Sequence, residues 1–564
     1  MKKAISVVLT VLLLTIPLLS LTGCGTQQSS GNPSTAATTS AAPSPGSQAA
    51  TTQGTEKAFT PNYPITDKPI TLKIFSTKAS VQGPWEEMSF FKYMEEMTNV
   101  HMEFILTTTD SYKEKKNLAF ASGDLPDVFF GGSGLTPTEE VKYGSEGLLI
   151  PLNNLIDTYA VNIQKLFSTT GGLREAITTD DGNIYSLFYY SGTPRGSQNC
   201  YWLNGKWLDA LGIKKADLPT TIEGLVELLK RFYNEDPNGN KVQDEIPLSI
   251  AVDGSKAISA LRSLILNSYG VIFNKDGFYA GDDGKVTFQF TSDKFRSYLQ
   301  LANELYASKL LDQNIFTQTT EQLIATGMDN KVGLVNASLP TGNYTIKTQT
   351  DEIKQFPMLN TLISAQNTKP VKNMNNAVTR GLYSITKACK YPEAAIRWVD
   401  YLYSYDGSMM TWQGAEGKGY AYVDSARKTW KQLLPEGKTT VEFRGSQTPA
   451  CGTSVPFYIY SGMLEGLTNT DELYSNAEAR VQMEYLKEAY PLVYFSESEN
   501  ADLSVSSTDV TTYLKEMEAQ FITGRLKIDD SNWKTYVSTI ESIGATKMQK
   551  IYQAAYDRYL NKKK

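Results

Sequence analysis

Apolar and polar positions alternate along this chain in a way that predicts strands and helices in turn. Residues 70–77 (ITLKIFST) and 100–106 (VHMEFIL) have a period of two, and 125–130 (LPDVFF) reads as a short buried strand before the glycine-rich GGSG. In residues 85–99 the apolar side chains instead follow helical spacing: Trp85, Met88, Phe91, Met94 and Met97. This mixture predicts an α/β fold.

The same periodicity predicts further helices downstream. Residues 220–232 have Leu225, Leu228, Leu229 and Phe232 on one face, after a hydroxyl cap at Thr220 or Thr221. Three later helices are predicted at 294–311, 391–404 and 548–560. We expect Trp207 and Trp398 to pack in the core, because both fall on apolar helix faces.

The N-terminus has the pattern of a secretory signal. Lys2 and Lys3 precede an apolar run over residues 4–21, and small residues follow in LTGC (21–24). A transmembrane anchor is the alternative reading, but Pro17 interrupts the run and no basic stop-transfer cluster follows it. LTGC resembles the bacterial lipobox, which implies that residues 1–23 are removed and that Cys24 is diacylated with lipid such as palmitate.

A linker follows the signal. Residues 25–55 carry no charge and consist almost entirely of Ser, Thr, Ala, Gly, Gln and Pro. Such a segment buries too little apolar surface to offset its ordering entropy. We therefore assign 24–68 to a flexible tether and 69–564 to the working body.

Charge and rare residues exclude several classes of protein. Without Lys2 and Lys3, 52 basic residues face 60 acidic ones, so nucleic acid is an unfavourable partner. His101 is the single histidine, and it lies in a predicted strand, which argues against a Ser/His/Asp triad and a zinc site. Two carboxylates suffice for a glycosidase, so hydrolysis stays an alternative. Cys200, Cys389 and Cys451 allow either one disulfide and a thiol or three thiols.

An acidic loop, EDPNGNKVQDEIP (residues 235–247), places oxygen ligands at alternate positions. Calcium prefers six to eight hard oxygens, which such a loop can supply. The glutamate that ends a standard EF-hand is replaced by Pro247. A simple Asn/Gly turn with solvated charges is the alternative.

Several sequence segments, taken together, resemble those of one family. They are FASGDLPDVFF, GLLIPLNNLIDTYAVNI, DGNIYSL, LNGKWLDALGI, the acidic loop, KACKYPEAAIRWVDYLYS, GAEGKGYAY, FITG and YQAAYDRYL. In this order they resemble the family 1 extracellular solute-binding proteins of bacterial ABC importers, especially the large lipoproteins similar to alginate-binding proteins. The resemblance implies a two-lobed periplasmic-binding-protein-like fold (type II). We expect lobe 1 at about 69–190 and 385–440, and lobe 2 at about 191–384 and 441–564.

The resemblance also implies a structural calcium ion in the acidic loop. Its relatives use an adjacent aspartate and glutamate at the ninth and tenth loop positions. The implied ligands are Asp236, Asn238, Asn240, the Val242 carbonyl, Asp244 and Glu245. Lys241 stands where the family has glycine, and a non-glycine residue at positive φ costs roughly 1 kcal/mol, so we expect a lowered calcium affinity.

Sugar recognition needs aromatic faces and polar groups around them. Candidates lie at strand ends and crossovers: Trp85, Gly132, Ser133, Tyr190, Arg195, Trp202, Arg380, Tyr383, Trp412 and Glu416. Arg195 and Arg380 have the fork geometry to clasp the carboxylate of an acidic sugar, and a neutral oligosaccharide is the equal alternative.

The expected function is that of a monomeric, lipid-anchored receptor without catalytic residues. It would capture an oligosaccharide on the extracellular face of the cell membrane, of a Gram-positive type, and deliver it to an ABC permease. A binding protein that feeds a sensor kinase and a surface carbohydrate hydrolase are the alternatives.

Overall fold

The computed structural model describes residues 61–252, 258–347 and 349–563. The predicted signal, Cys24 and most of the predicted linker therefore lie outside the described residues. Within the described ranges, no helix is both long and apolar enough to cross a membrane.

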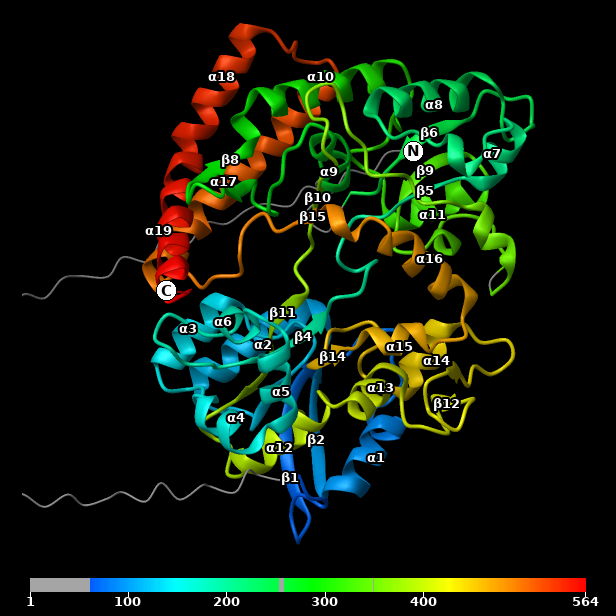
Figure 1. The fold of residues 1–564 in the computed structure, drawn as a ribbon. Coiled ribbons are helices and arrows are strands. Elements are labelled where there is room, and N and C mark those ends of the chain that lie inside the picture. Colours follow the sequence, from blue (N-terminus) through cyan, green and yellow to red (C-terminus); the bar gives the residue numbers. More distant parts are fainter. Residues whose placement is uncertain (1–60, 253–257, 348, 564) are drawn as a thin grey trace, which may run out of the picture. The chain divides into compact units, whose positions relative to one another are not determined.

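Lobe 1 is built on a six-stranded mixed sheet (Figure 1). Its strands, in spatial order, are β14 (Phe457–Ile459), β4 (Leu187–Ser191), β11 (Val378–Ile385), β3 (Val128–Phe130), β1 (Ile70–Thr77) and β2 (Val100–Thr107). β1 is parallel to both β2 and β3, whereas β11 runs antiparallel to β3 and β4. Because β1 and β3 end at the same edge, the loops that follow them lie side by side.

Helices cover this sheet. They are α1 (Ser89–Thr98), α2 (Thr109–Ser122), α3 (Pro137–Ser145), α4 (Asn153–Tyr159), α5 (Val161–Thr169), α6 (Leu173–Ala176), α12 (Pro392–Tyr401), α13 (Tyr405–Gln413), α14 (Thr440–Gln447) and α15 (Ser461–Glu465). A hairpin of β12 (Tyr420–Tyr422) and β13 (Trp430–Gln432) packs near α13. The core of lobe 1 joins the strands to Trp398 and Ile396 of α12.

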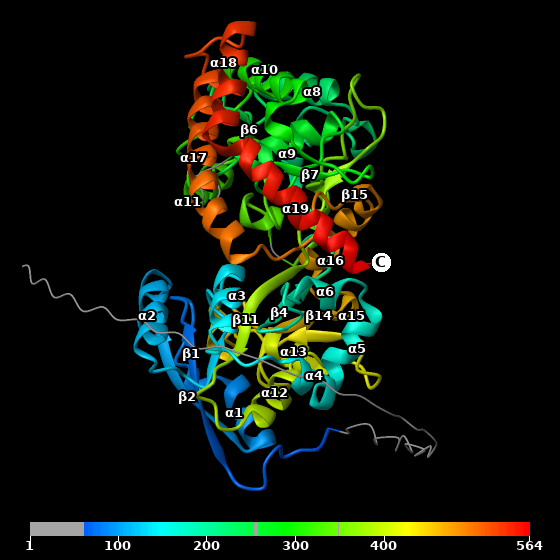
Figure 2. The ribbon, with the colours of Figure 1, turned by 90° about the vertical axis from the view of Figure 1, so that its left-hand side faces the viewer.

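Lobe 2 surrounds a three-stranded sheet in the order β5 (Tyr201–Leu203), β9 (Val332–Asn336), β6 (Ile246–Ser249). Its short pairs are β7 (Phe278–Ala280) with β8 (Val286–Phe288), and β10 (Lys372–Asn373) with β15 (Leu486–Lys487). Its helices are α7 (Gly205–Ala210), α8 (Ile222–Asn234), α9 (Ser259–Ser268), α10 (Asp293–Ala307), α11 (Thr320–Met328), α16 (Thr470–Arg480), α17 (Glu497–Ile522), α18 (Asp530–Ile540) and α19 (Thr546–Lys563). α17 contacts α19, which runs obliquely to it in Figure 2.

Three chain segments pass between the lobes. They follow β4, precede β11, and join α15 to α16. The expected lobe boundaries differ from this in two places. β11 belongs to the lobe 1 sheet although it begins at Val378, and β14 pairs with β4 although residues 441–564 were assigned to lobe 2. Pairing between strands that are distant in sequence places both β11 and β14 in lobe 1.

Several predicted elements match the structure. β1 has the expected bounds, and the Thr221 side chain caps α8 by accepting from Gly224 N at 3.0 Å. Trp207 and Trp398 are fully buried, as expected. The predicted helix at 85–99 begins later, at Ser89, because Trp85–Glu87 forms a 3-10 turn and Met88 is extended. His101 lies on β2, exposed, 3.1 Å from Glu95.

Candidate functional site

A cavity of about 530 Å³, the large cavity, is lined by both lobes and by the segments between them. Lobe 1 contributes Pro137, Thr138 and Arg380. The remaining lining residues are Asn199, Ser259, Ser263, Phe273, Asn274, Lys275, Asp276, Asn373, Met374, Asn375, Asn376, Ala489, Tyr490, Pro491, Leu492, Val493, Phe495, Asn500 and Tyr552. A molecule held here would touch both lobes, which is the condition for a ligand to favour one lobe arrangement.

Asparagine side chains dominate the polar lining. They are Asn199, Asn274, Asn373, Asn375, Asn376 and Asn500. Asn373 is a structural hub, since its Oδ1 accepts from Phe273 N at 3.1 Å and from Asn267 Nδ2 at 3.2 Å. Asn375 and Asn376 are exposed just before β11. Each amide offers both a donor and an acceptor, which matches the dual character of a sugar hydroxyl.

Aromatic rings supply the apolar part of the wall. Phe273, Tyr490, Phe495 and Tyr552 all line the cavity. The Tyr490 hydroxyl donates to the Tyr552 carbonyl at 2.6 Å, and the Tyr552 hydroxyl donates to Asp276 Oδ2 at 2.5 Å. Burial raises the pKa of Tyr490, so it stays a donor across the physiological range. These rings are therefore held in place by bonds that do not involve a ligand.

The charged side chains that line the described part of the cavity all have hydrogen-bond partners within the protein. Lys275 Nζ lies 2.8 Å from Asp276 Oδ2. The Arg380 guanidinium donates to the Ala176 carbonyl at 3.1 Å and to the Val493 carbonyl at 3.2 Å, and it stacks 4.2 Å from the Tyr494 ring. The lining is thus mainly amide and aromatic in character, and its charged side chains are already engaged by the protein.

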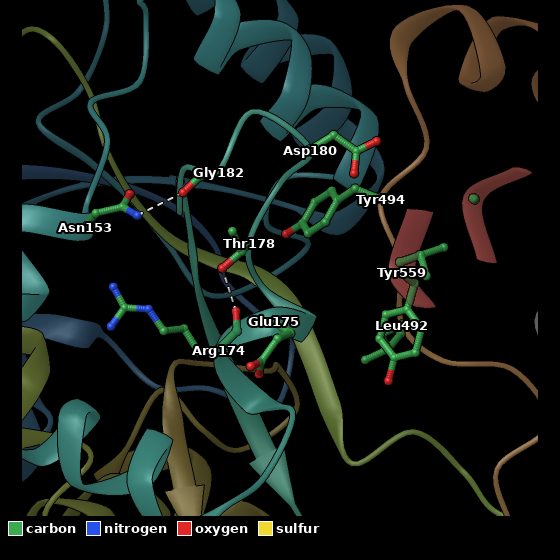
Figure 3. Close-up of a pocket in the computed structure, with 11 residues that line it drawn as sticks. Asn153, Arg174, Glu175, Thr178, Asp180, Gly182, Leu492, Tyr494 and Tyr559 are labelled. Carbon is green, nitrogen blue, oxygen red and sulfur yellow. Dashed lines mark hydrogen bonds between the residues drawn. The ribbon is translucent and has the colours of Figure 1, made fainter. Parts of the chain in front are cut away.

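A second cavity of about 260 Å³, the small cavity, adjoins the first (Figure 3). Leu492 and Val493 line both cavities. On its lobe 1 side, Arg174 forms a two-pronged ion pair with Asp157 at 2.8 and 3.0 Å, and Asn153 donates to the Gly182 carbonyl at 3.0 Å. Asn153 therefore holds the loop at Gly182, while Arg174 is engaged by Asp157.

Of the ten sugar-contact candidates, Arg380 alone lines either cavity. Trp85, Trp202 and Tyr383 have at most 1% of their surface exposed. Trp85 packs among Phe91, Phe104 and Phe130 of the lobe 1 core. These three side chains present no face to a sugar ring in this conformation, so we correct their assignment to core packing.

The other candidates lie apart from the cavities. Gly132 and Ser133 form a tight turn against Thr77, with Ser133 exposed. Tyr190 stacks on Tyr458 with ring centroids 4.5 Å apart. The remaining three are engaged elsewhere: Arg195 pairs with Glu472, Trp412 packs on Trp430, and Glu416 pairs with Arg427.

Sequence reasoning missed most of the cavity. One available signal was the amide run in KNMNN (residues 372–376), directly before the strand that crosses into lobe 1. A second was the aromatic YPLVYF (490–495). In neither segment does the residue spacing distinguish ligand contacts from an ordinary loop. The other residues that line the cavity come from four distant segments of the chain.

The acidic loop adopts a tight, internally bonded form. Lys241 has φ +63°, as expected for a position that favours glycine. Asn238 and Asn240 both donate to Asp244 Oδ1, at 3.0 and 2.9 Å, and Lys331 pairs with Asp244 Oδ2 at 3.1 Å. Burial would raise the pKa of Asp244, but these amides and the ammonium hold it below its usual value.

Two buried carboxylate oxygens of this loop have no hydrogen-bond partner among the described residues: Asp236 Oδ1 and Glu245 Oε1. Burial, together with the charges of Asp236 and Asp244, raises the pKa of Glu245. Orphaned oxygens of this kind fit a cation. Yet no group of three or more His, Cys, Asp or Glu side chains in the described ranges has metal-binding geometry, and Asn238 and Asn240 direct their amide nitrogens to Asp244.

The three cysteines of the described chain are all free thiols. Cys200 and Cys451 are buried, and Cys389 is half-buried. Burial raises the pKa of each thiol. The alternative of one disulfide is therefore not observed.

The chain shows clear likeness to known proteins. Residues 76–409 match the family model described as bacterial extracellular solute-binding protein. The fructooligosaccharide ABC transporter substrate-binding protein FusA of Streptococcus pneumoniae serotype 4 is 26% identical over 514 residues, covering 88% of this chain and 92% of FusA.

Solved structures share the fold. FusA in complex with kestose superposes with a TM-score of 0.72 at 24% identity, covering 87% of this chain and all of the other. An HMO binding solute binding protein from Bifidobacterium longum infantis gives 0.74 at 21% identity, covering 88% and 99%. The alginate-binding protein AlgQ2, solved without calcium ion, gives 0.65 at 24% identity, covering 87% and 99%.

Proposed function

This chain belongs to the bacterial extracellular solute-binding protein family, and from that premise we propose that it captures an oligosaccharide outside the cell and hands it to an ABC permease. FusA is a fructooligosaccharide ABC transporter substrate-binding protein, and the Bifidobacterium protein is an HMO binding, ABC-transporter associated solute binding protein, which supports this assignment. The fold is the two-lobed α/β type expected from the sequence. A receptor of this kind binds its ligand and returns it unchanged.

The amide-lined cavity between the lobes is the observation that carries the proposal. Polar amides with aromatic rings suit a polyhydroxyl ligand that has apolar faces. The charged side chains in the described lining are already paired, and Arg195, the other candidate for a carboxylate, pairs with Glu472. To gain a cation, a uronate carboxylate would therefore have to displace the carbonyls bound to Arg380 or the carboxylate bound to Lys275. We propose an uncharged oligosaccharide as the ligand.

Calorimetric titration tests the assignment. We expect neutral oligosaccharides, with kestose as the first probe, to bind, and oligogalacturonate to bind at least tenfold more weakly, because an unpaired carboxylate is costly to desolvate. Replacing Asn376 in the cavity by alanine should weaken binding about three- to tenfold, the effect of one or two hydrogen bonds. The exposed Asn561, outside both cavities, is the matched control.

Three outcomes would contradict the proposal. Tighter binding of oligogalacturonate would reverse the charge assignment. No binding across a panel of neutral glycans would remove the receptor function. Shorter sugar chains after incubation, seen by chromatography, would favour a surface hydrolase instead.

The anchoring and localisation are also part of the proposal. We propose that diacylated Cys24 holds the protein on the extracellular face of the membrane, with residues 24–68 as its tether. The support is the signal pattern and the lipobox resemblance in the sequence. A tethered receptor stays close to its permease while it moves between capture and delivery.

We further propose that the acidic loop binds calcium in a structural role. Asp236, Asp244, Glu245 and the Val242 carbonyl would supply oxygens, with Asn238 and Asn240 after their amides turn over. The two orphaned carboxylate oxygens support this. The loop follows α8, and none of its residues lines either cavity, so the ion would stabilise lobe 2 and take no part in ligand binding.

Replacing Lys241 by glycine is expected to stabilise the protein by about 1 kcal/mol in calcium and to raise calcium affinity. Glycine adopts φ +63° without the steric cost of a Cβ atom, and the change removes a positive charge beside the ion. Thermal unfolding with calcium or chelator measures this. Lys309, at φ +58° but outside the loop, is the control, because its change to glycine should not alter the calcium response. An unchanged melting temperature after chelation of the wild type would leave the loop as a turn.

A further inference from the structure

A short strap, residues 489–495 between β15 and α17, forms one wall of the large cavity. All its residues except Tyr494 line that cavity. Tyr494 instead points to the other side and lines the small cavity, where Figure 3 shows it between the loop of Asp180 and Gly182 and the helix that carries Tyr559. The position of this wall therefore depends on what holds the strap.

The strap is attached to lobe 2 at both of its ends. Ala280 N of β7 donates to the Ala489 carbonyl at 2.8 Å, and the Tyr490 hydroxyl donates to the Tyr552 carbonyl of α19. The Phe495 ring packs on Tyr552 with centroids 5.1 Å apart. These contacts move with lobe 2.

Between these ends, the strap is attached to lobe 1. The Tyr494 hydroxyl donates to Glu140 Oε2 of α3 at 2.9 Å, and the same oxygen accepts from the Ser186 hydroxyl. Arg380 of β11 stacks on the Tyr494 ring and donates to the Val493 carbonyl. Glu140 and Ser186 are completely buried and Tyr494 is 3% exposed. A buried bond of this kind holds the wall in one place.

We propose that Tyr494 and Glu140 are positioning residues that pin the cavity wall to lobe 1, so that oligosaccharide affinity depends on a hydrogen bond that the ligand never touches. This inference rests on the proposed function for its ligand, but not for its geometry. Without this bond the middle of the strap is free to move. The strap then has to become ordered when a ligand binds, which lowers the affinity.

Titration of the Glu140 carboxyl makes the attachment of the strap to lobe 1 sensitive to pH. Burial raises the pKa of Glu140 to about 7, opposed by the bonds from Ser186 and Tyr494 and by the charge of Arg380, while neighbouring Glu139 raises it. Released into water, the same carboxyl would titrate near its usual value of 4.5. The attached state is thus most favoured below the lower pKa of 4.5, weakens as pH rises from there to about 7, and changes little above that pH.

Binding of kestose to the full chain, measured from pH 5.5 to 8.5, tests the proposal. The wild-type Kd should rise from pH 5.5 to about 7 and then level off. Y494F, which keeps the ring on Arg380, should bind about tenfold more weakly at pH 6. E140Q keeps the acceptor but has no titrating charge, so its Kd should stay nearly flat with pH. Y344F is the matched control, because it removes a buried bond from the Tyr344 hydroxyl to the Trp202 carbonyl, neither residue lines a cavity, and the variant should keep wild-type affinity.

Amide hydrogen exchange over residues 489–495 gives a readout without ligand. Y494F should exchange faster there than the wild type, and Y344F should not. If wild type fails to bind kestose while the strap still loosens in Y494F, the proposed ligand is wrong and the positioning role stands. If Y494F keeps both wild-type exchange and wild-type affinity, the positioning role is wrong.

Discussion

Replacing Arg262 by methionine is expected to lower the free energy of unfolding by about 3–5 kcal/mol. Arg262 of α9 forms a two-pronged ion pair with Glu518 of α17, Nε to Oε1 at 2.8 Å and Nη2 to Oε2 at 2.5 Å. The Tyr298 hydroxyl of α10 donates to the same carboxylate at 2.6 Å. With Arg262 and Glu518 only 4% and 2% exposed, loss of the arginine would leave a buried carboxylate unpaired.

Chemical denaturation near neutral pH measures this effect. The double variant R262M/E518L is the control, because an apolar pair of similar volume removes the orphaned charge and should recover most of the loss. The ion pair also matters for the site, since α9 carries Ser259 and Ser263 of the large cavity. A loss below about 1 kcal/mol in R262M would mean that water reaches Glu518 and screens its charge.

Replacing Cys24 by alanine is expected to move the protein almost entirely from the membrane to the soluble fraction. Each buried methylene of a lipid chain contributes about 0.8 kcal/mol, so two chains anchor the protein stably. Without Cys24 no chain is attached, and this anchoring is lost. Residues 24–68 would allow a reach on the order of 35 Å from the membrane. The expected result follows from residues 1–24 alone.

Fractionation of cells, with mass spectrometry of the mature N-terminus, measures the anchoring. Cys451→Ala is the matched control, because this buried thiol lies in lobe 1 and its loss should leave the protein in the membrane fraction. Wild-type protein in the soluble fraction with an unmodified Cys24 would contradict the anchor. An uncleaved N-terminus in the membrane would instead favour the transmembrane alternative.

The elements of the fold were predictable wherever periodicity was strong. β1 has the predicted bounds and alternates over its first five residues, and α8 has its apolar face and its hydroxyl cap. The helix predicted from Trp85 begins at Ser89, since helical spacing alone does not exclude a 3-10 turn. Local patterns of this kind depend on neighbours within a few residues, which is why sequence suffices for them.

The lobe assignment and the site depended on contacts between distant segments. β14 follows β4 by more than 260 residues, and yet the two strands pair. Trp85, Trp202 and Tyr383 have rings as suitable for a sugar face as Phe495, but packing buries these three in the core, whereas Phe495 is half-buried at the cavity. Arg195 and Arg380 had the chemistry to hold a carboxylate, and their partners from other segments satisfied them first.

Residue order alone thus sufficed for the secretory pattern, the strand and helix periods, the oxygen-rich loop and the resemblance to a two-lobed family. Tertiary structure decided which strands share a sheet, which aromatic rings are buried and which charges are already paired. The physical reason is that periodicity and capping act over one or two turns, whereas burial and charge pairing arise only where segments far apart in the chain meet.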